Sequence, residues 1–185
     1  MTPPESFLRT YTALAEMDVR LSHLALFPMP NFEDVRGHLL RQDVVWVGGG
    51  SVVNLLAVWR AHALDRVLHE CWQARVVLGG VSAGSLCWHV GGTTDSFGLE
   101  LRPVTDALGW LPFANGVHYD TEPQQLVAEG ALPTAYATDD GVGLIYRGAQ
   151  MAEAVTQLDG KAAYLVQRGD DGGAHETVLT PRQLT

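Results

Sequence analysis

A serine flanked by glycines, in the sequence G-V-S-A-G at residues 80–84, is the segment of this chain best suited to chemistry. The apolar run at residues 76–78 precedes it, and residues 85–88 follow without a helix breaker. This order is typical of a strand, a tight turn and a helix, with the serine hydroxyl exposed at the tip. Glycines fit where strand and helix backbones lie too close for a Cβ. We therefore predict that Ser82 is a nucleophile that attacks a carbonyl, the alternative being a purely structural glycine turn.

A serine nucleophile requires a general base, and the base requires an acid that orients it. Among the seven histidines, His118 alone is predicted to end a strand in a non-helical context with a glycine nearby, so we predict that it is the base. His89 is too close to Ser82 along the predicted helix to reach back over the turn. The orienting acid stays open among the carboxylates expected near the same sheet edge: Asp95, Glu100, Asp120, Asp139 and Asp140.

A second glycine-rich segment, V-G-G-G-S at residues 47–51, is predicted to join a strand to a long helix capped by Ser51. A strand, a glycine loop and a helix together form a geometry that binds anions through backbone N–H groups. A dinucleotide-binding loop is the alternative, but Val53 stands at its third glycine position, so the match to that fingerprint is partial.

The length, charge and cysteine content of the chain exclude several classes of protein. The chain has 185 residues, of which 46% are hydrophobic and 18% charged, which predicts one globular domain over residues 1–185 with a sizeable core. The formal net charge of −9 argues against binding of nucleic acid through a basic face. Two cysteines, Cys71 and Cys87, are too few for a disulfide framework, and a zinc site would need them closer together in sequence. The first residues do not resemble a signal peptide, and no apolar run is long enough for a membrane span, so we expect a cytoplasmic protein without a membrane partner.

Strands and helices are predicted to alternate through the first two thirds of the chain. This order predicts an α/β fold in which helices on both faces sandwich a mostly parallel sheet, finished by antiparallel C-terminal strands. Sites in such sheets lie at the carboxyl ends of the strands, where the glycine loop, Ser82 and His118 would converge. The predicted helices are residues 5–17, 32–41, 52–74 and 122–130; the predicted strands are 20–27, 43–47, 110–118, 135–138, 142–146, 152–157 and 162–167, and residues 91–98 are predicted to be a polar loop.

Seven short motifs occur in one order along most of the chain. They are V-G-G-G at 47–50, N-L-L at 54–56, G-V-S-A-G-S-L-C-W at 80–88, T-D-S-F-G at 94–98, L-G-W-L-P-F at 108–113, H-Y-D at 118–120 and D-D-G at 139–141. In residues, order and spacing they resemble the peptidase E, or aspartyl dipeptidase, family of serine peptidases, with cyanophycinase as a more distant relative. The resemblance implies a fold like that of class I glutamine amidotransferases and flavodoxin.

The resemblance also implies roles for individual residues. It implies that Ser82 is the nucleophile and that His118 is first the general base and then the general acid. It implies an oxyanion hole formed by the backbone N–H groups of Gly50 and Ala83.

The third member of the triad is implied to be an acid in the loop after the nucleophile helix, where Asp95 matches. Relatives use other acids, so Glu100 and Asp140 are kept in reserve. No metal or organic cofactor is implied, and the expected partner is a short peptide substrate.

The chain departs from the family pattern in three places. Family members usually begin with a strand, a helix and a second strand that precede the helix predicted here at residues 5–17. Either the chain is truncated or its sheet is completed otherwise, for example by a second copy in a homodimer. Ser51 and Val52 stand where the family often has asparagine and threonine. Residues 120–125 read D-T-E-P-Q-Q, without the arginine associated with aspartyl specificity, so we do not expect strict preference for N-terminal aspartate.

The sequence is therefore compatible with three functions. The first is a serine peptidase that cleaves short peptides through an acyl-enzyme on Ser82. The second is an esterase or amidase that acts on small acyl substrates with the same serine. The third is a catalytically inactive homologue that acts as a binding module, suggested by the missing N-terminal elements.

Overall fold

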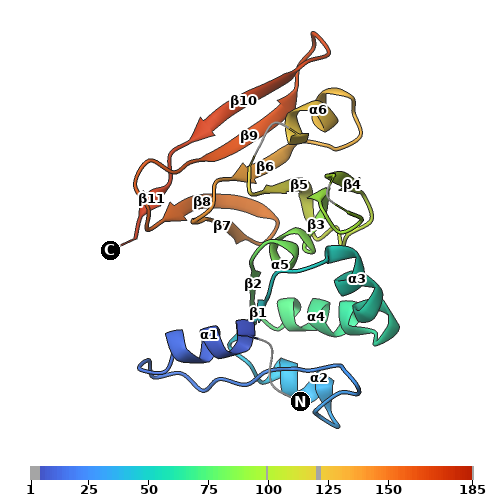
Figure 1. The fold of residues 1–185 in the computed structure, drawn as a ribbon, viewed down its shortest axis with the longest axis vertical. Coiled ribbons are helices and arrows are strands. Elements are labelled where there is room, and N and C mark those ends of the chain that lie inside the picture. The colour runs from blue at the N-terminus through green and yellow to red at the C-terminus, as the bar shows by residue number, and fades with distance from the viewer. Residues whose placement is uncertain (1–4, 99, 120–121, 185) are drawn as a thin grey trace. The chain divides into compact units, whose positions relative to one another are not determined.

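The computed structural model describes residues 5–98, 100–119 and 122–184 (Figure 1). It divides into two compact units, which we describe separately. The first unit comprises Met1–Val45 and Val67–Val77, and the second comprises Trp46–Arg66 and Leu78–Thr185. Every residue predicted to take part in chemistry belongs to the second unit. None of the helices in the described ranges is long and apolar enough to cross a membrane.

The first unit begins with helices α1 (Glu5–Ala13) and α2 (Val35–Leu40). The predicted strand at residues 20–27 is wrong, because this segment does not join a sheet. The Asn31 side chain instead forms hydrogen bonds with the backbone of this segment. Its Oδ1 accepts from the Ala25 N–H at 2.9 Å, and its Nδ2 donates to the His23 carbonyl at 2.9 Å. A side chain that satisfies the backbone in this way competes with strand pairing.

The helix predicted over residues 52–74 is two helices, α3 (Val52–Ala61) and α4 (Leu64–Gln73). Ala63, between them, has a φ of +53°, which a continuous α-helix excludes. The start of α3 is as predicted, because the Ser51 side chain accepts a hydrogen bond from the Asn54 N–H at 3.2 Å. Val52 and Leu56 are buried on the inner face of this helix.

Strands β1 (Val44–Val47) and β2 (Val77–Gly80) form a two-stranded sheet. The predicted strand at residues 43–47 is present as β1. An apolar run of this kind is typical of a buried parallel strand, but Trp46 is 63% exposed. Within the second unit, the Val81 N–H donates to the Val47 carbonyl at 3.1 Å. This bond brings the segment after β1, which is the glycine loop, beside the segment after β2, which carries Ser82.

A six-stranded sheet forms the centre of the second unit, and it confirms the α/β class. Its parallel part is three adjacent strands, β3, β5 and β6, and every other pair in it is antiparallel. Helix α6 (Glu122–Ala128) packs on this sheet over an apolar cluster that includes Val127 and Val166. In spatial order the strands are β10 (Ala174–Leu179), β9 (Ala163–Arg168), β6 (Ala135–Thr138), β5 (Leu111–Val117), β3 (His89–Thr94) and β4 (Arg102–Val104).

The last part of the chain adds a three-stranded sheet in the order β11-β8-β7. It comprises β7 (Val142–Arg147), β8 (Gln150–Thr156) and β11 (Arg182–Gln183). The antiparallel pairs β7–β8, β6–β9 and β9–β10 confirm the predicted antiparallel finish of the fold.

Candidate active site

Ser82 stands at the tip of a turn between strand β2 and the short helix α5 (Ala83–Leu86). Its φ of +54° and ψ of −118° lie in a region that a residue other than glycine rarely adopts. A Cβ on Gly80 would lie 2.3 Å from the Gly84 carbonyl oxygen, and one on Gly84 would lie 2.2 Å from the Val47 carbonyl oxygen. The two glycines that flank Ser82 therefore allow the close approach of strand and helix backbones that the sequence predicts. Ser82 Oγ does not cap α5, which leaves the hydroxyl available for other contacts.

The glycine loop lies beside this serine. A Cβ built on Gly49 would be 3.3 Å from Ser82 Cβ and 3.9 Å from Ser82 Oγ, so a larger residue there would crowd the hydroxyl. Gly50 has a φ of +136°, a conformation that favours glycine. In the described part of the chain, the backbone N–H groups of Gly50 and Ala83 have no hydrogen-bond acceptor. These two donors are therefore free to bind an oxyanion.

A third loop, after β3, is tied to the start of α3. The Val52 N–H donates to Ser96 Oγ at 3.0 Å, and this hydroxyl is itself 2.8 Å from Thr94 Oγ1. The loop that contains Asp95 thus lies next to the glycine loop. The carboxyl ends of β1 and β3 therefore contribute to one region of the second unit, as the α/β prediction required.

His118 follows β5, and Asp140 follows the adjacent parallel strand β6. Val117 pairs with Thr138 in the register of these strands, so the residues that come next in each chain segment meet at one edge. His118 Nδ1 donates to Asp140 Oδ1 at 2.5 Å. This contact leaves Nε2 as the ring nitrogen that can take a proton from a nucleophile. Both side chains are exposed to solvent, by 60% for His118 and 72% for Asp140.

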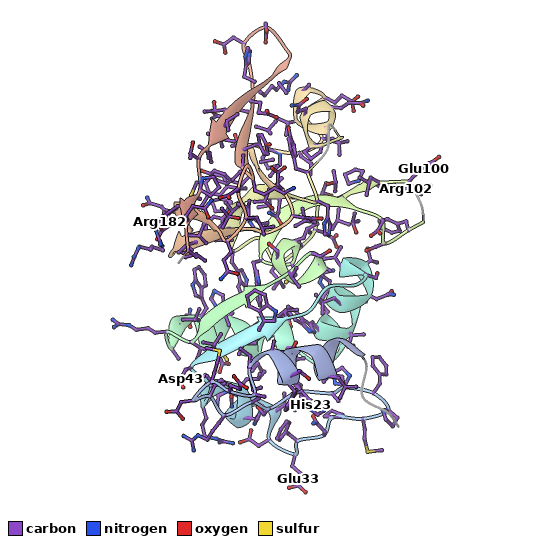
Figure 2. The ribbon with its side chains drawn as sticks, turned by 60° about the vertical axis from the view of Figure 1, so that its left-hand side comes forward. His23, Glu33, Asp43, Glu100, Arg102 and Arg182 are labelled. Carbon is purple, nitrogen blue, oxygen red and sulfur yellow. The ribbon has the colours of Figure 1, made fainter. Side chains whose placement is uncertain are left out.

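Asp140 is the predicted acid that the structure brings to His118. Asp95 follows β3, on the other side of β5, and in the described ranges neither a hydrogen bond nor an ion pair joins it to His118. Figure 2 shows Glu100 at the outer end of the loop between β3 and β4, pointing away from the ribbon. The Asp139 carboxylate accepts a hydrogen bond from the Ala162 N–H at 3.0 Å. Asp120 lies outside the described residues.

The Ser82 and His118 side chains contact different neighbours. The serine is packed against the glycine loop and the histidine is paired with Asp140, and no hydrogen bond between Ser82 Oγ and the His118 ring is present in the part of the chain that the structure describes. Hydrogen bonds between catalytic groups are often long without substrate and shorten in the substrate complex. The roles of both residues therefore stay predictions.

His89 is buried in the core rather than exposed at this edge. It is 2% exposed, its Nδ1–H donates to the Ser85 carbonyl at 3.1 Å, and its Nε2 accepts from the Tyr146 hydroxyl at 3.1 Å. Burial lowers the pKa of His89 to about 4, against the opposing effect of the backbone acceptors. A buried neutral ring with both nitrogens occupied is not a general base, as its position along the chain suggested.

The state of His89 predicts how stability depends on pH. The pKa of His89 is about 6.5 in the unfolded chain and about 4 in the folded protein. Between these values the unfolded chain binds the proton and the folded protein does not, so the free energy of unfolding is highest above pH 6.5 and decreases as the pH falls toward 4. The shift corresponds to about 3 kcal/mol of unfolding free energy. Urea unfolding from pH 4 to 7 should show this slope in the wild type and in the exposed-site control His62→Gln. His89→Gln should flatten it, and an unchanged slope would contradict the assignment.

Comparison with known proteins decides the family. The model of peptidase family S51 matches residues 2–153. The chain belongs to peptidase family S51. It is 37% identical over 181 residues to the uncharacterized peptidase YgaJ of Bacillus subtilis (strain 168), a match that covers 94% of this chain and 75% of the relative. The resemblance to peptidase E that the motifs indicated is thereby confirmed, and the S51 chain is a peptidase by family.

A solved structure is also similar to this S51 chain. It is the crystal structure of a proposed peptidase E protein from Listeria monocytogenes EGD-e, 17% identical, with a TM-score of 0.44. The match covers 80% of this chain and 65% of the Listeria chain, so this chain spans less than two thirds of that protein.

Some features near the site were missed by sequence reasoning. Tyr119 lies in the H-Y-D motif and Gln124 follows closely, but sequence reasoning gave neither residue a role at His118. Glu176 lies on β10, a strand that was not predicted, so no motif connects it to His118. Among the residues described, no group of three or more His, Cys, Asp or Glu side chains is arranged to hold a metal ion.

Proposed function

We propose that this S51 peptidase is a serine peptidase that hydrolyses short peptides through an acyl-enzyme on Ser82. The observation that carries the proposal is the conformation of Ser82: a strained, positive-φ serine at a strand–turn–helix tip, beside a glycine loop with free N–H groups. Strained backbone at such a position is typical of functional sites. The Ser82 side chain does not cap α5, so its hydroxyl has no capping role at this turn.

The first half of the reaction forms the acyl-enzyme. Ser82 Oγ attacks the scissile carbonyl carbon while its proton passes to His118 Nε2. Asp140 accepts the hydrogen bond from Nδ1–H and so favours the tautomer whose Nε2 is basic. The N–H groups of Gly50 and Ala83 donate to the oxyanion of the tetrahedral intermediate. His118 then gives the proton to the leaving amine, and the carbon–nitrogen bond breaks.

The second half regenerates the serine. A water molecule attacks the acyl carbon and gives its proton to His118. The second tetrahedral intermediate collapses, the ester bond to Ser82 breaks, and Ser82 Oγ recovers the proton from His118. The products are an amine and a carboxylic acid, so the sum of the two halves is hydrolysis of one peptide bond. Each of the two oxyanions uses the same pair of backbone donors.

Asp140 is proposed as the acid of the triad. Its 2.5 Å contact with His118 supports this role, whereas Asp95 is the acid that the family resemblance implies. Both follow strands that neighbour β5, one on each side. Asp95 and Glu100 therefore stay as the alternatives that mutagenesis must exclude.

Residues 120–125 contain no arginine, so we propose a specificity broader than N-terminal aspartate. A panel of dipeptides is expected to be cleaved with kcat/KM values for N-terminal aspartate and for uncharged residues within about tenfold of each other. Exclusive cleavage of aspartyl peptides would contradict this specificity. Chromogenic esters serve as the comparison: rapid ester turnover without peptide cleavage would favour the esterase, and no turnover of either class would favour the inactive homologue.

A further inference from the structure

His118 is held in an unusual backbone conformation. Its φ is +56°, in the left-handed region that residues other than glycine seldom adopt. Such a conformation persists only when the surrounding structure enforces it. On one side of His118 is Val117, the last residue of β5, which is fixed by pairing with Thr138 of β6. The restraint on the other side must come from the next residue, Tyr119.

Tyr119 is anchored by its backbone and by its ring. Its N–H donates to the Thr138 carbonyl at 3.0 Å, which continues the register of β5 on β6. Its ring stacks on Tyr164 of β9, with centroids 4.4 Å apart and planes at 28°, and it packs against the apolar cluster beneath α6. The hydroxyl adds a further anchor at the far end of the ring.

The hydroxyl of Tyr119 donates to Oε2 of Glu176, on strand β10. The same oxygen accepts from Gln124 Nε2, on α6, at 2.6 Å, and this nitrogen is also 2.8 Å from the Tyr119 hydroxyl. Burial, reinforced by the hydrogen bond and charge of Glu176, raises the pKa of Tyr119, so its hydroxyl keeps the proton that it donates. Figure 1 shows β10 and α6 in adjoining parts of the second unit, and the two elements pack against each other. One carboxylate therefore joins three elements next to His118.

We propose that Tyr119 and Glu176 are positioning residues that hold His118 in its left-handed conformation, with Nδ1 directed at Asp140. Without the carboxylate, the Tyr119 ring loses its fixed direction and the backbone at His118 can relax to a negative φ. The Nδ1–H bond to Asp140 is then lost, together with the tautomer that it favours. The catalytic consequence rests on the proposed function, whereas the position of the imidazole does not.

Kinetics of two disruptive variants and one rescue variant test the proposal. Tyr119→Phe keeps the stacked ring but removes the hydroxyl, and Glu176→Ala removes its acceptor. Each is expected to lower kcat for dipeptide hydrolysis by about 10- to 100-fold with KM within about twofold, because a small displacement of a catalytic group is costly. Glu176→Gln retains an acceptor oxygen for the hydroxyl and should stay within about threefold of the wild type, since a neutral hydrogen bond still forms.

Glu129→Ala is the matched control, because the Glu129 carboxylate accepts from Gln125 on α6 much as Glu176 accepts from Gln124. It should leave kcat unchanged. Thermal unfolding of every variant identifies any that fails to fold. A kcat unchanged in Tyr119→Phe and Glu176→Ala would overturn the proposal. So would a loss in Glu176→Gln equal to that in Glu176→Ala.

The ring nitrogens of His118 give a readout that does not need catalysis. In alkaline solution, the ¹⁵N shifts of the wild type should report the Nδ1–H tautomer, and Glu129→Ala should match it. Tyr119→Phe and Glu176→Ala should shift toward the Nε2–H tautomer, and Glu176→Gln should restore the wild-type pattern. Unchanged shifts in the two disruptive variants would overturn the positioning role. If the wild type cleaves no peptide while the shifts change as expected, the proposed function fails and the positioning role stands.

Discussion

Replacing Ser82 with alanine is expected to lower kcat for dipeptide hydrolysis by about 10⁵-fold, which leaves only the rate that the rest of the site supports. The hydroxyl is the proposed nucleophile, and no other group at this turn can form the acyl-enzyme. The thermal unfolding temperature should stay close to that of the wild type, because Ser82 Oγ does not cap α5 and alanine keeps the Cβ. Initial rates of peptide cleavage and a melting curve measure the two effects together.

Ser85→Ala is the matched control for this experiment. Ser85 lies one turn further along the same segment, within α5, and its substitution removes a hydroxyl from the same motif. We expect it to retain most of the activity. Turnover unchanged in Ser82→Ala would exclude Ser82 as the nucleophile. Loss of activity accompanied by unfolding would instead assign the serine a structural role.

Asp140→Asn is expected to lower kcat by about 10²- to 10³-fold. Loss of the carboxylate from a buried triad costs about 10⁴-fold, because the histidine adopts the wrong tautomer. The pair described here is exposed, so water weakens its interaction and the expected loss is smaller. KM should change little, since Asp140 contacts the base rather than the substrate.

Asp95→Asn separates the two candidate acids. If Asp140 orients His118, Asp95→Asn should change kcat by less than about tenfold, and the double variant should resemble Asp140→Asn alone. A larger loss in Asp95→Asn than in Asp140→Asn would assign the triad to Asp95, as the family resemblance implies. Glu100→Gln, in the exposed loop of Figure 2, tests the remaining alternative acid in the same way. Asp106→Asn is the control, because it removes an exposed carboxylate that pairs with Arg60 and was not a candidate acid.

The parts of the site set by local backbone geometry could be predicted from sequence. Gly80 and Gly84 are needed because backbone atoms approach within a distance that no Cβ permits. The two glycines in the sequence therefore predict this close approach directly. Ser51 caps α3 for an equally local reason. The order of strand, turn and helix around Ser82 depends on neighbours in the chain, so a single sequence contains the information.

Strand β3 could not be predicted in the same way. Its sequence, H-V-G-G-T-T, favours the end of a helix and a polar loop, because glycine pairs usually mark turns. In the structure, a Cβ on Gly91 would lie 2.0 Å from the Val104 carbonyl oxygen, and one on Gly92 would lie 2.1 Å from that of Asn115. These glycines allow neighbouring strands to approach closely. The backbone atoms that they approach belong to residues that are distant in sequence.

The choice of acid also depends on strand order. Asp95 and Asp140 follow β3 and β6, which flank β5 on opposite sides, so the strand order allows either acid to lie beside His118. The orientation of the imidazole distinguishes them, and we propose that it depends on the contact between Tyr119 and Glu176, which are 57 residues apart. Long-range pairing of this kind leaves no pattern in one sequence.

The proposed function requires that the His118 imidazole activates Ser82 as a nucleophile. Treatment with an organophosphonate ester that labels activated serines, followed by peptide mass mapping, detects this activation. Such activation predicts one adduct per chain, on Ser82, and a much slower reaction in His118→Ala. An intact wild-type protein that takes up no label, or takes it up at another residue, would contradict it.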